Sequence, residues 1–205
     1  MHETADGHHT RRTLAGPGSG RYVERRSQFF AYATPVAGAP ELAAWLAKLR
    51  RAHHDARHLP HAWVAADGAE RHSDDGEPAG TGGRPCQAAL GADGLRAAAV
   101  AVARLYGGVP LGAANLGRAY GLAARSAVAD AGVVEQRPHC RLHLRLAYPL
   151  VPLAERWLAS VAAADIRRTF GTEAGISAWI PETAVPDLPA ALGPNHWVAD
   201  AGQWR

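Results

Sequence analysis

Cysteine, lysine and long apolar runs are scarce in this 205-residue chain, and each shortage excludes a class of protein. Two cysteines without a Cys-x-x-Cys spacing predict neither a disulfide framework nor a zinc ribbon. No run approaches the eighteen or so apolar residues that a membrane-spanning helix needs. Residues 1–20 lack the apolar segment of a secretory signal, so we expect a cytoplasmic protein without a membrane partner.

Arginine supplies almost all of the positive charge, since Lys48 is the single lysine among 22 basic residues. A GC-rich genome explains this bias more simply than phosphate recognition by guanidinium groups does. The formal net charge is +3. Residues 1–134 hold 15 basic and 12 acidic residues, whereas residues 135–205 hold 7 of each. The electrostatic footprint of an anionic partner is therefore expected in the first two thirds of the chain.

Hydrophobic residues make up 47% of the chain, and their spacing predicts an α+β protein of two domains after a mobile tail over residues 1–20. The first domain is expected over residues 21–132, and residues 133–138 read as a linker. Its predicted elements are a strand at 29–34, a helix from Pro40, a strand at 62–66, a helix at 85–90, a buried strand at 96–104 and a helix at 115–130.

The second domain, expected over residues 138–205, begins with a strand at 139–146 in which apolar and polar residues alternate. Its other predicted elements are a helix at 153–161, a hairpin of strands 166–170 and 176–180, a short helix at 185–192 and a strand at 196–199. This order is the ferredoxin-like plan. The polar face of the first strand (His139, Arg141, His143 and Arg145) can meet RNA phosphate, but such a row is more often the solvated side of a sheet.

A polar run from Ser73 to Pro85 is the most informative segment of the chain. Asp74, Asp75 and Glu77 would repel one another in one tight loop unless a cation, a basic partner or backbone N–H groups accept them. They offer oxygen ligands suited to Mg²⁺ or Ca²⁺, yet the run by itself is more typical of turns than of a metal site. The glycine-rich residues 80–84 can place N–H groups around a phosphate or around one of the loop's own carboxylates.

A second glycine-rich segment, residues 104–112, joins a predicted strand to a predicted helix. Glycines let the backbone approach a ligand closely, with Arg104 and Arg118 on either side. Either an external anion binds there, or these arginines neutralise the carboxylates of the first run. Both interpretations predict that the two loops meet. His58, in a histidine-rich stretch, is interpreted as a partly buried residue at a polar helix end rather than as a zinc ligand.

Together and in this order, the motifs resemble the YigZ/IMPACT family over about residues 20–130. The resemblance rests on Ser27-Gln28-Phe29, Asp55-Ala56-Arg57-His58, Ala62-Trp63, Ser73 to Pro85, Arg104 to Gly108, Leu111-Gly112 and Arg118 to Gly121. It implies a first domain similar to the βαβ fold of domain IV of elongation factor G and of a ribosomal protein domain. It also implies a second, ferredoxin-like domain similar to domain V of that factor.

The resemblance also implies an association with RNA or the ribosome, and eukaryotic relatives regulate translation. Pro110 and Pro60 stand where lysine and cysteine are common in the family, which weakens the case for a phosphate grip and for thiol chemistry.

We expect a translation-associated regulatory protein, without catalysis or a cofactor, that binds RNA, a ribosome or a protein partner through the two loops. The alternatives are a divalent-metal hydrolase using Asp74, Asp75 and Glu77, with His58 as its base, and a pure protein-interaction module. The expected binding residues are Ser73, Asp74, Asp75, Glu77, Gly80, Thr81, Arg84, Arg104, Tyr106, Gly107, Gly108, Arg118, Tyr120 and His58.

Overall fold

The computed structural model describes residues 10–188, 197–199 and 203–204, and the chain divides into two compact units near residue 135. The first unit, residues 11–135, contains a five-stranded antiparallel sheet with the order β2-β3-β6-β4-β5. These strands are β2 (Gly18–Glu24), β3 (Ser27–Pro35), β6 (Ala98–Leu105), β4 (His61–Val64) and β5 (Glu70–Ser73). Six consecutive residues of the central strand β6 are buried, because helices cover both faces of the sheet. The buried strand expected at 96–104 is confirmed.

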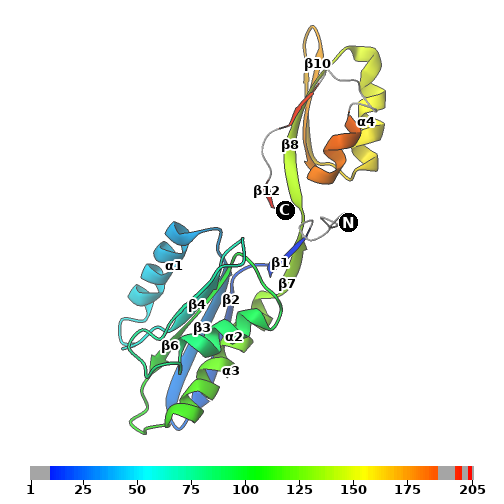
Figure 1. Ribbon diagram of the computed structural model, residues 1–205. Helices are drawn as coiled ribbons and strands as arrows, with labels where there is room; N and C mark the ends of the chain where they lie inside the picture. The colour runs from blue at the N-terminus through cyan, green and yellow to red at the C-terminus, as the bar shows by residue number, and fades with distance from the viewer. Residues whose placement is uncertain (1–9, 189–196, 200–202, 205) are drawn as a thin grey trace, which may run out of the picture. The chain divides into compact units, whose positions relative to one another are not determined.

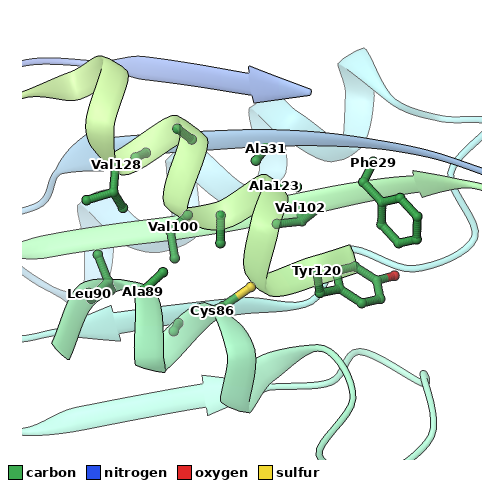
Figure 2. Close-up of a cluster of buried hydrophobic side chains, with 14 of the residues drawn as sticks. Phe29, Ala31, Cys86, Ala89, Leu90, Val100, Val102, Tyr120, Ala123 and Val128 are labelled. Carbon is green, nitrogen blue, oxygen red and sulfur yellow. The ribbon is translucent and has the colours of Figure 1, made fainter. Parts of the chain in front are cut away.

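Helix α1 (Ala39–Ala52) covers one face of this sheet, and α2 (Gly83–Gly91) and α3 (Ala113–Ala131) cover the other (Figure 1). On the α1 side, Leu49 packs with the predicted apolar face of the helix against Ala101 and Ala103. On the other side lies the larger core, where side chains of β3 and β6 meet those of α2 and α3 (Figure 2). Because β3 and β4 both pair with β6, the β3-α1-β4 segment forms the expected βαβ arrangement.

The predicted tail over residues 1–20 is wrong for its second half. Strand β1 (Arg11–Leu14) pairs with β7 (Val133–Gln136), and Leu14 is 2% exposed in the core. Strand β2 begins at Gly18 and lies against α3. The predicted linker 133–138 is likewise mostly strand. Strands β1 and β7 are only four residues each, and they pair across about 120 positions, which no local pattern reports. Residues 1–9 lie outside the described residues.

The second unit has a four-strand antiparallel path with the order β11-β8-β10-β9, and β12 (Gln203–Trp204) also pairs with β8. The strands are β8 (Pro138–Leu146), β9 (Ala164–Phe170), β10 (Ala174–Pro181) and β11 (Trp197–Ala199), and helix α4 (Val151–Ser160) follows the short 3₁₀ turn η1 (Tyr148–Leu150). This strand order and the predicted hairpin confirm the ferredoxin-like plan. The helix expected at 185–192 begins inside the 3₁₀ segment η2 (Glu182–Asp187), and its second half, 189–192, lies outside the described residues.

The fold is α+β in both units, as expected. Among the described residues, no helix is both long enough and apolar enough to span a bilayer.

Candidate functional site

A cleft of about 490 Å³ lies at one end of the first unit's sheet, where three connecting segments converge. The segment before β4 contributes Asp55, Arg57 and His58, and the carboxylate run contributes Glu77 and Pro78. The segment from the end of β6 into α3 contributes the rest. Tyr106, Pro110, Leu111 and Leu116 form an apolar wall, and Arg57 and Arg104 add positive charge. The two glycine-rich loops therefore meet, as both interpretations of the sequence predicted.

Glu77 forms the back of this cleft and is the most buried carboxylate of the run, with a side chain 4% exposed. Its Oε1 accepts hydrogen bonds from Nη1 of Arg104 at 2.9 Å and from the hydroxyl of Tyr120 at 2.7 Å. Burial, and then the hydrogen bond to Glu77, raise the pKa of Tyr120, so its hydroxyl stays a donor. The carboxylate thus joins its loop to β6 and α3.

Asp74 accepts hydrogen bonds from three backbone N–H groups. Its Oδ1 accepts from Gly82 at 2.9 Å and from Gly83 at 2.8 Å, and its Oδ2 accepts from Gly80 at 2.8 Å. These groups lie just before and at the start of α2, whose N-terminal N–H groups have no partner within the helix. Burial raises the pKa of this carboxyl, but the three N–H bonds outweigh it, so the pKa lies below its ordinary value.

Asp75 holds the first loop against α1 and the segment before β4. Its Oδ1 accepts from Nη2 of Arg50, and its Oδ2 accepts from the N–H of Leu59 at 2.6 Å. Burial raises the pKa of Asp75, and the bonds from Arg50 and Leu59 more than offset that effect. The carbonyl of Asp75 lies 2.7 Å from Nδ1 of His58. A carbonyl only accepts, so Nδ1 carries the proton and Nε2 of the neutral ring is an acceptor.

The hydrolase alternative required Asp74, Asp75 and Glu77 to share a cation, and the structure does not support that arrangement. Each of the three carboxylates is oriented toward a different set of donors from the protein itself. Within the described part of the chain, no three His, Cys, Asp or Glu side chains cluster to hold a metal ion. The mutual repulsion of the three carboxylates is offset because Arg50 pairs with Asp75 and Arg104 pairs with Glu77. Backbone N–H groups bind the third carboxylate, Asp74.

The other expected residues of the first loop support its shape. The hydroxyl of Ser73 accepts from the N–H of Asp75 at 3.1 Å, and that of Thr81 donates to the carbonyl of Pro78 at 2.7 Å. Gly80 has a φ of +75°, which favours glycine. Arg84 is exposed in the first turn of α2 and does not line the cleft.

The second loop exposes an aromatic ring above a buried guanidinium. Arg104 lies 5.7 Å from the ring centroid of Phe29 and 5.4 Å from that of Tyr106, which is 60% exposed. The Nε of Arg104 is buried without a hydrogen-bond partner among the described residues. A Cβ at Gly107 would lie 2.2 Å from the carbonyl carbon of Arg26, so glycine allows the loop to rest on the turn between β2 and β3. Gly108 has a φ of +81°.

One of the two interpretations of the sequence had Arg118 neutralise a carboxylate of the first run, and the structure contradicts that pairing. Nη2 of Arg118 contacts Oε2 of Glu24 at 2.9 Å, and the arginine side chain is 56% exposed. Arg118 precedes Tyr120 by two residues on α3, which places their side chains on nearly opposite sides of the helix. Only Tyr120 can therefore reach Glu77.

Sequence reasoning missed three arginines at this end of the sheet. Arg25 and Arg26 occupy the β2–β3 turn with φ values of +44° and +70°, and Arg57 lines the cleft. All three are exposed, and none forms an ion pair with a described residue. The turn was overlooked because it has no glycine, asparagine or aspartate, the usual signals of a hairpin.

Comparison with known proteins gives the same family for most of the chain. Residues 25–128 match the family model of the Impact N-terminal domain. The IMPACT family member YigZ of Escherichia coli is 30% identical over 172 residues, which cover 82% of this chain and 84% of YigZ. An IMPACT family member of Haemophilus influenzae is 40% identical over 103 residues, 47% of this chain and 49% of that protein. The latter match thus spans about half the length of the relative.

A solved structure shares the architecture of both units. The crystal structure of a hypothetical protein has a TM-score of 0.67 and 27% sequence identity, and the match covers 94% of this chain and 97% of that one. The family model matches half of the residues of this chain. The Escherichia coli relative matches over most of its own length. The chain belongs to the IMPACT family.

Proposed function

We propose that this protein is a cytoplasmic, translation-associated protein without catalytic activity that binds unpaired RNA at the cleft end of its first unit. The observation that carries the proposal is a basic and aromatic surface made of Arg25, Arg26, Arg57, Tyr106 and the underlying Arg104, hereafter the cleft surface. Exposed aromatic rings beside arginines are the usual means by which proteins hold single-stranded RNA.

The charges of the cleft surface favour an anionic partner. Glu77 is neutralised by Arg104, and Glu24 pairs with Arg118. Among the described residues, Asp55 is the remaining carboxylate at the cleft, against three arginines without a carboxylate partner. Two of those arginines occupy left-handed backbone positions, which cost about 1 kcal/mol or more for each residue that is not glycine. Backbone strain of this kind is typical of residues held in place for binding.

Anisotropy of a fluorescein-labelled, unstructured RNA tests the proposal between about 50 and 200 mM KCl. Arg25→Gln with Arg26→Gln should weaken binding and lower the dependence of log Kd on log[KCl] by about 1 to 2. Arg51→Gln with Arg71→Gln removes the same charge from exposed arginines of α1 and β5 outside the cleft, and should leave the affinity within about twofold. Equal losses from both double variants would contradict a defined RNA surface.

The role of the aromatic ring has its own test. Tyr106→Ala should raise Kd about five- to 150-fold, because stacking on one base contributes about 1–3 kcal/mol. Tyr106→Phe should bind like the native protein. Sedimentation with ribosomes through a sucrose cushion then tests the link to translation. Co-sedimentation should disappear in the Arg25→Gln, Arg26→Gln variant. Salt-independent, nuclease-resistant capture of a single protein, without affinity for RNA, would instead identify a protein-interaction module.

A further inference from the structure

The second unit has a basic hollow on the side of its sheet that α4 does not cover. Alternate residues of β8 and β10, such as Leu144 and Ile176, are buried beneath α4. The residues between them face the other way. With two residues of β9, they line a hollow of about 520 Å³ that includes Arg141, His143, Arg145, Arg167, Thr169 and Ser177.

A glycine creates the depth of this hollow. Gly175 in β10 lies opposite Arg145 of β8 and Thr169 of β9. A Cβ at Gly175 would lie 2.4 Å from Oγ1 of Thr169, so no larger side chain fits between its neighbours without a shift. The open face is therefore hollowed at β10, where the side chain is missing, and longer basic side chains stand on β8 and β9 at either side.

The open face of the sheet is basic, although residues 135–205 as a whole have no net charge. Residues 135–205 hold equal numbers of basic and acidic residues, yet within the described part of this unit no carboxylate lines the hollow. Glu155 of α4 lies on the helix side, where it pairs with Arg168 at 2.8 Å. Arg145 and Arg167 are exposed and form no ion pair with any described residue.

Among the described residues that line the hollow, none offers an exposed aromatic ring for base stacking. Trp179 is 8% exposed, and the guanidinium of Arg141 lies over its ring at 5.5 Å. Nη2 of Arg141 also donates to the hydroxyl of Ser177 at 3.3 Å. A surface of this kind offers guanidinium and hydroxyl donors to phosphate oxygens, but no platform for an unpaired base.

From these observations we infer that the open face of the β8–β10–β9 sheet binds the phosphate backbone of an RNA stem. Arg145 and Arg167 flank the hollow from strands two positions apart, about 10 Å across at the usual strand spacing. Double-stranded RNA is recognised mainly through its shape and its phosphates, which this face suits. The site lies in a different unit from the cleft surface and does not depend on it.

Anisotropy of the full-length protein with a labelled RNA hairpin of about 20 base pairs tests this inference. Arg145→Gln with Arg167→Gln should raise Kd about tenfold near 100 mM KCl and lower the salt dependence of log Kd by about 1 to 2. The matched control is Arg156→Gln with Arg168→Gln, which removes the same charge from the helix side of the unit and should change Kd less than about twofold.

Equal weakening by the two double variants would overturn the inference, because net charge alone would then explain binding. Displacement of the hairpin by polyglutamate at the same charge concentration would also overturn it, in favour of an acidic polypeptide. The Arg25→Gln, Arg26→Gln background separates the two surfaces. The loss from Arg145→Gln with Arg167→Gln should persist there, since independent sites contribute additively. If that loss of affinity disappeared, only the site on the second unit would be contradicted. If Arg25→Gln with Arg26→Gln bound RNA as tightly as the native protein, only the cleft surface would be contradicted.

Discussion

The hydroxyl of Tyr120 on α3 donates to Oε1 of Glu77, the same oxygen that Arg104 of β6 contacts. Glu77 and Tyr120 are 43 residues apart, so one carboxylate joins the first loop to two elements formed much later in the chain. The pairing makes the back of the cleft rigid, while Tyr106 at its edge remains exposed. Binding residues carried by a rigid wall lose little entropy when a ligand arrives.

Tyr120→Phe removes one of the two side-chain donors to Glu77 without changing the shape of the core. A buried acceptor that loses a partner costs about 1–3 kcal/mol, and we expect a loss in that range. Urea unfolding followed by circular dichroism measures it. Tyr106→Phe, at an exposed ring, should change stability by less than about 0.5 kcal/mol. Equal stability of the two variants would show that the Tyr120 hydroxyl does not stabilise the fold.

Arg104 and Arg118 should differ sharply when each is replaced by methionine. The side chains of the Arg104–Glu77 pair are 12% and 4% exposed, and breaking a buried pair costs about 3–5 kcal/mol. The Arg118–Glu24 pair is largely exposed at Arg118 and should contribute at most about 1 kcal/mol. Thermal melting of Arg104→Met and Arg118→Met compares them. A larger loss from Arg118→Met would contradict the observed pairing.

Asp74→Asn removes the carboxylate that binds the N–H groups at the start of α2, and its effect should depend on pH. The pKa of Asp74 is lower in the folded protein than its ordinary value, so its contribution to stability is present above the unfolded-state pKa, about 3.9. That contribution is lost as pH falls through the folded-state pKa. We expect Asp74→Asn to cost about 1–2 kcal/mol at pH 7 and progressively less from about pH 4 downward. A difference that stays constant from pH 7 to about pH 3 would contradict this assignment.

Gly18→Ala tests whether residues 11–20 belong to the fold. A Cβ at Gly18 would lie 2.3 Å from the backbone nitrogen of Ala131 in α3, so we expect a loss of about 1–3 kcal/mol. Gly16 has nothing within 4 Å of such a Cβ, and Gly16→Ala should change stability by less than about 0.5 kcal/mol. Chemical unfolding of both variants provides the comparison. Indistinguishable midpoints would mean that β2 does not pack against α3.

Local patterns predicted most of the helices and central strands, because alternation and helical spacing report which face is buried. For the carboxylates, the sequence could predict the types of hydrogen-bond donor but not which donor each one uses. Three acids in one loop need donors, and the sequence could name backbone N–H groups and arginines as candidates. Which donor each acid uses depends on tertiary structure: Tyr120 reaches Glu77, while Arg118, two residues earlier, points toward Glu24. Strands β1 and β7 escaped prediction because each is defined by its distant partner.

The pairing of β1 with β7 also has a consequence for the order of events during synthesis. The first strand of the unit to be made, Arg11–Leu14, has its partner at Val133–Gln136, and the β2–β3 hairpin is not covered by α3 until that helix is made. In the nascent unit, β1 therefore has no partner strand, and the sheet face that α3 covers stays exposed, until the last residues of the unit emerge. Contacts between such distant residues slow folding, and exposed edges of this kind invite aggregation. A premature stop before residue 133 would leave β1 without its partner strand β7.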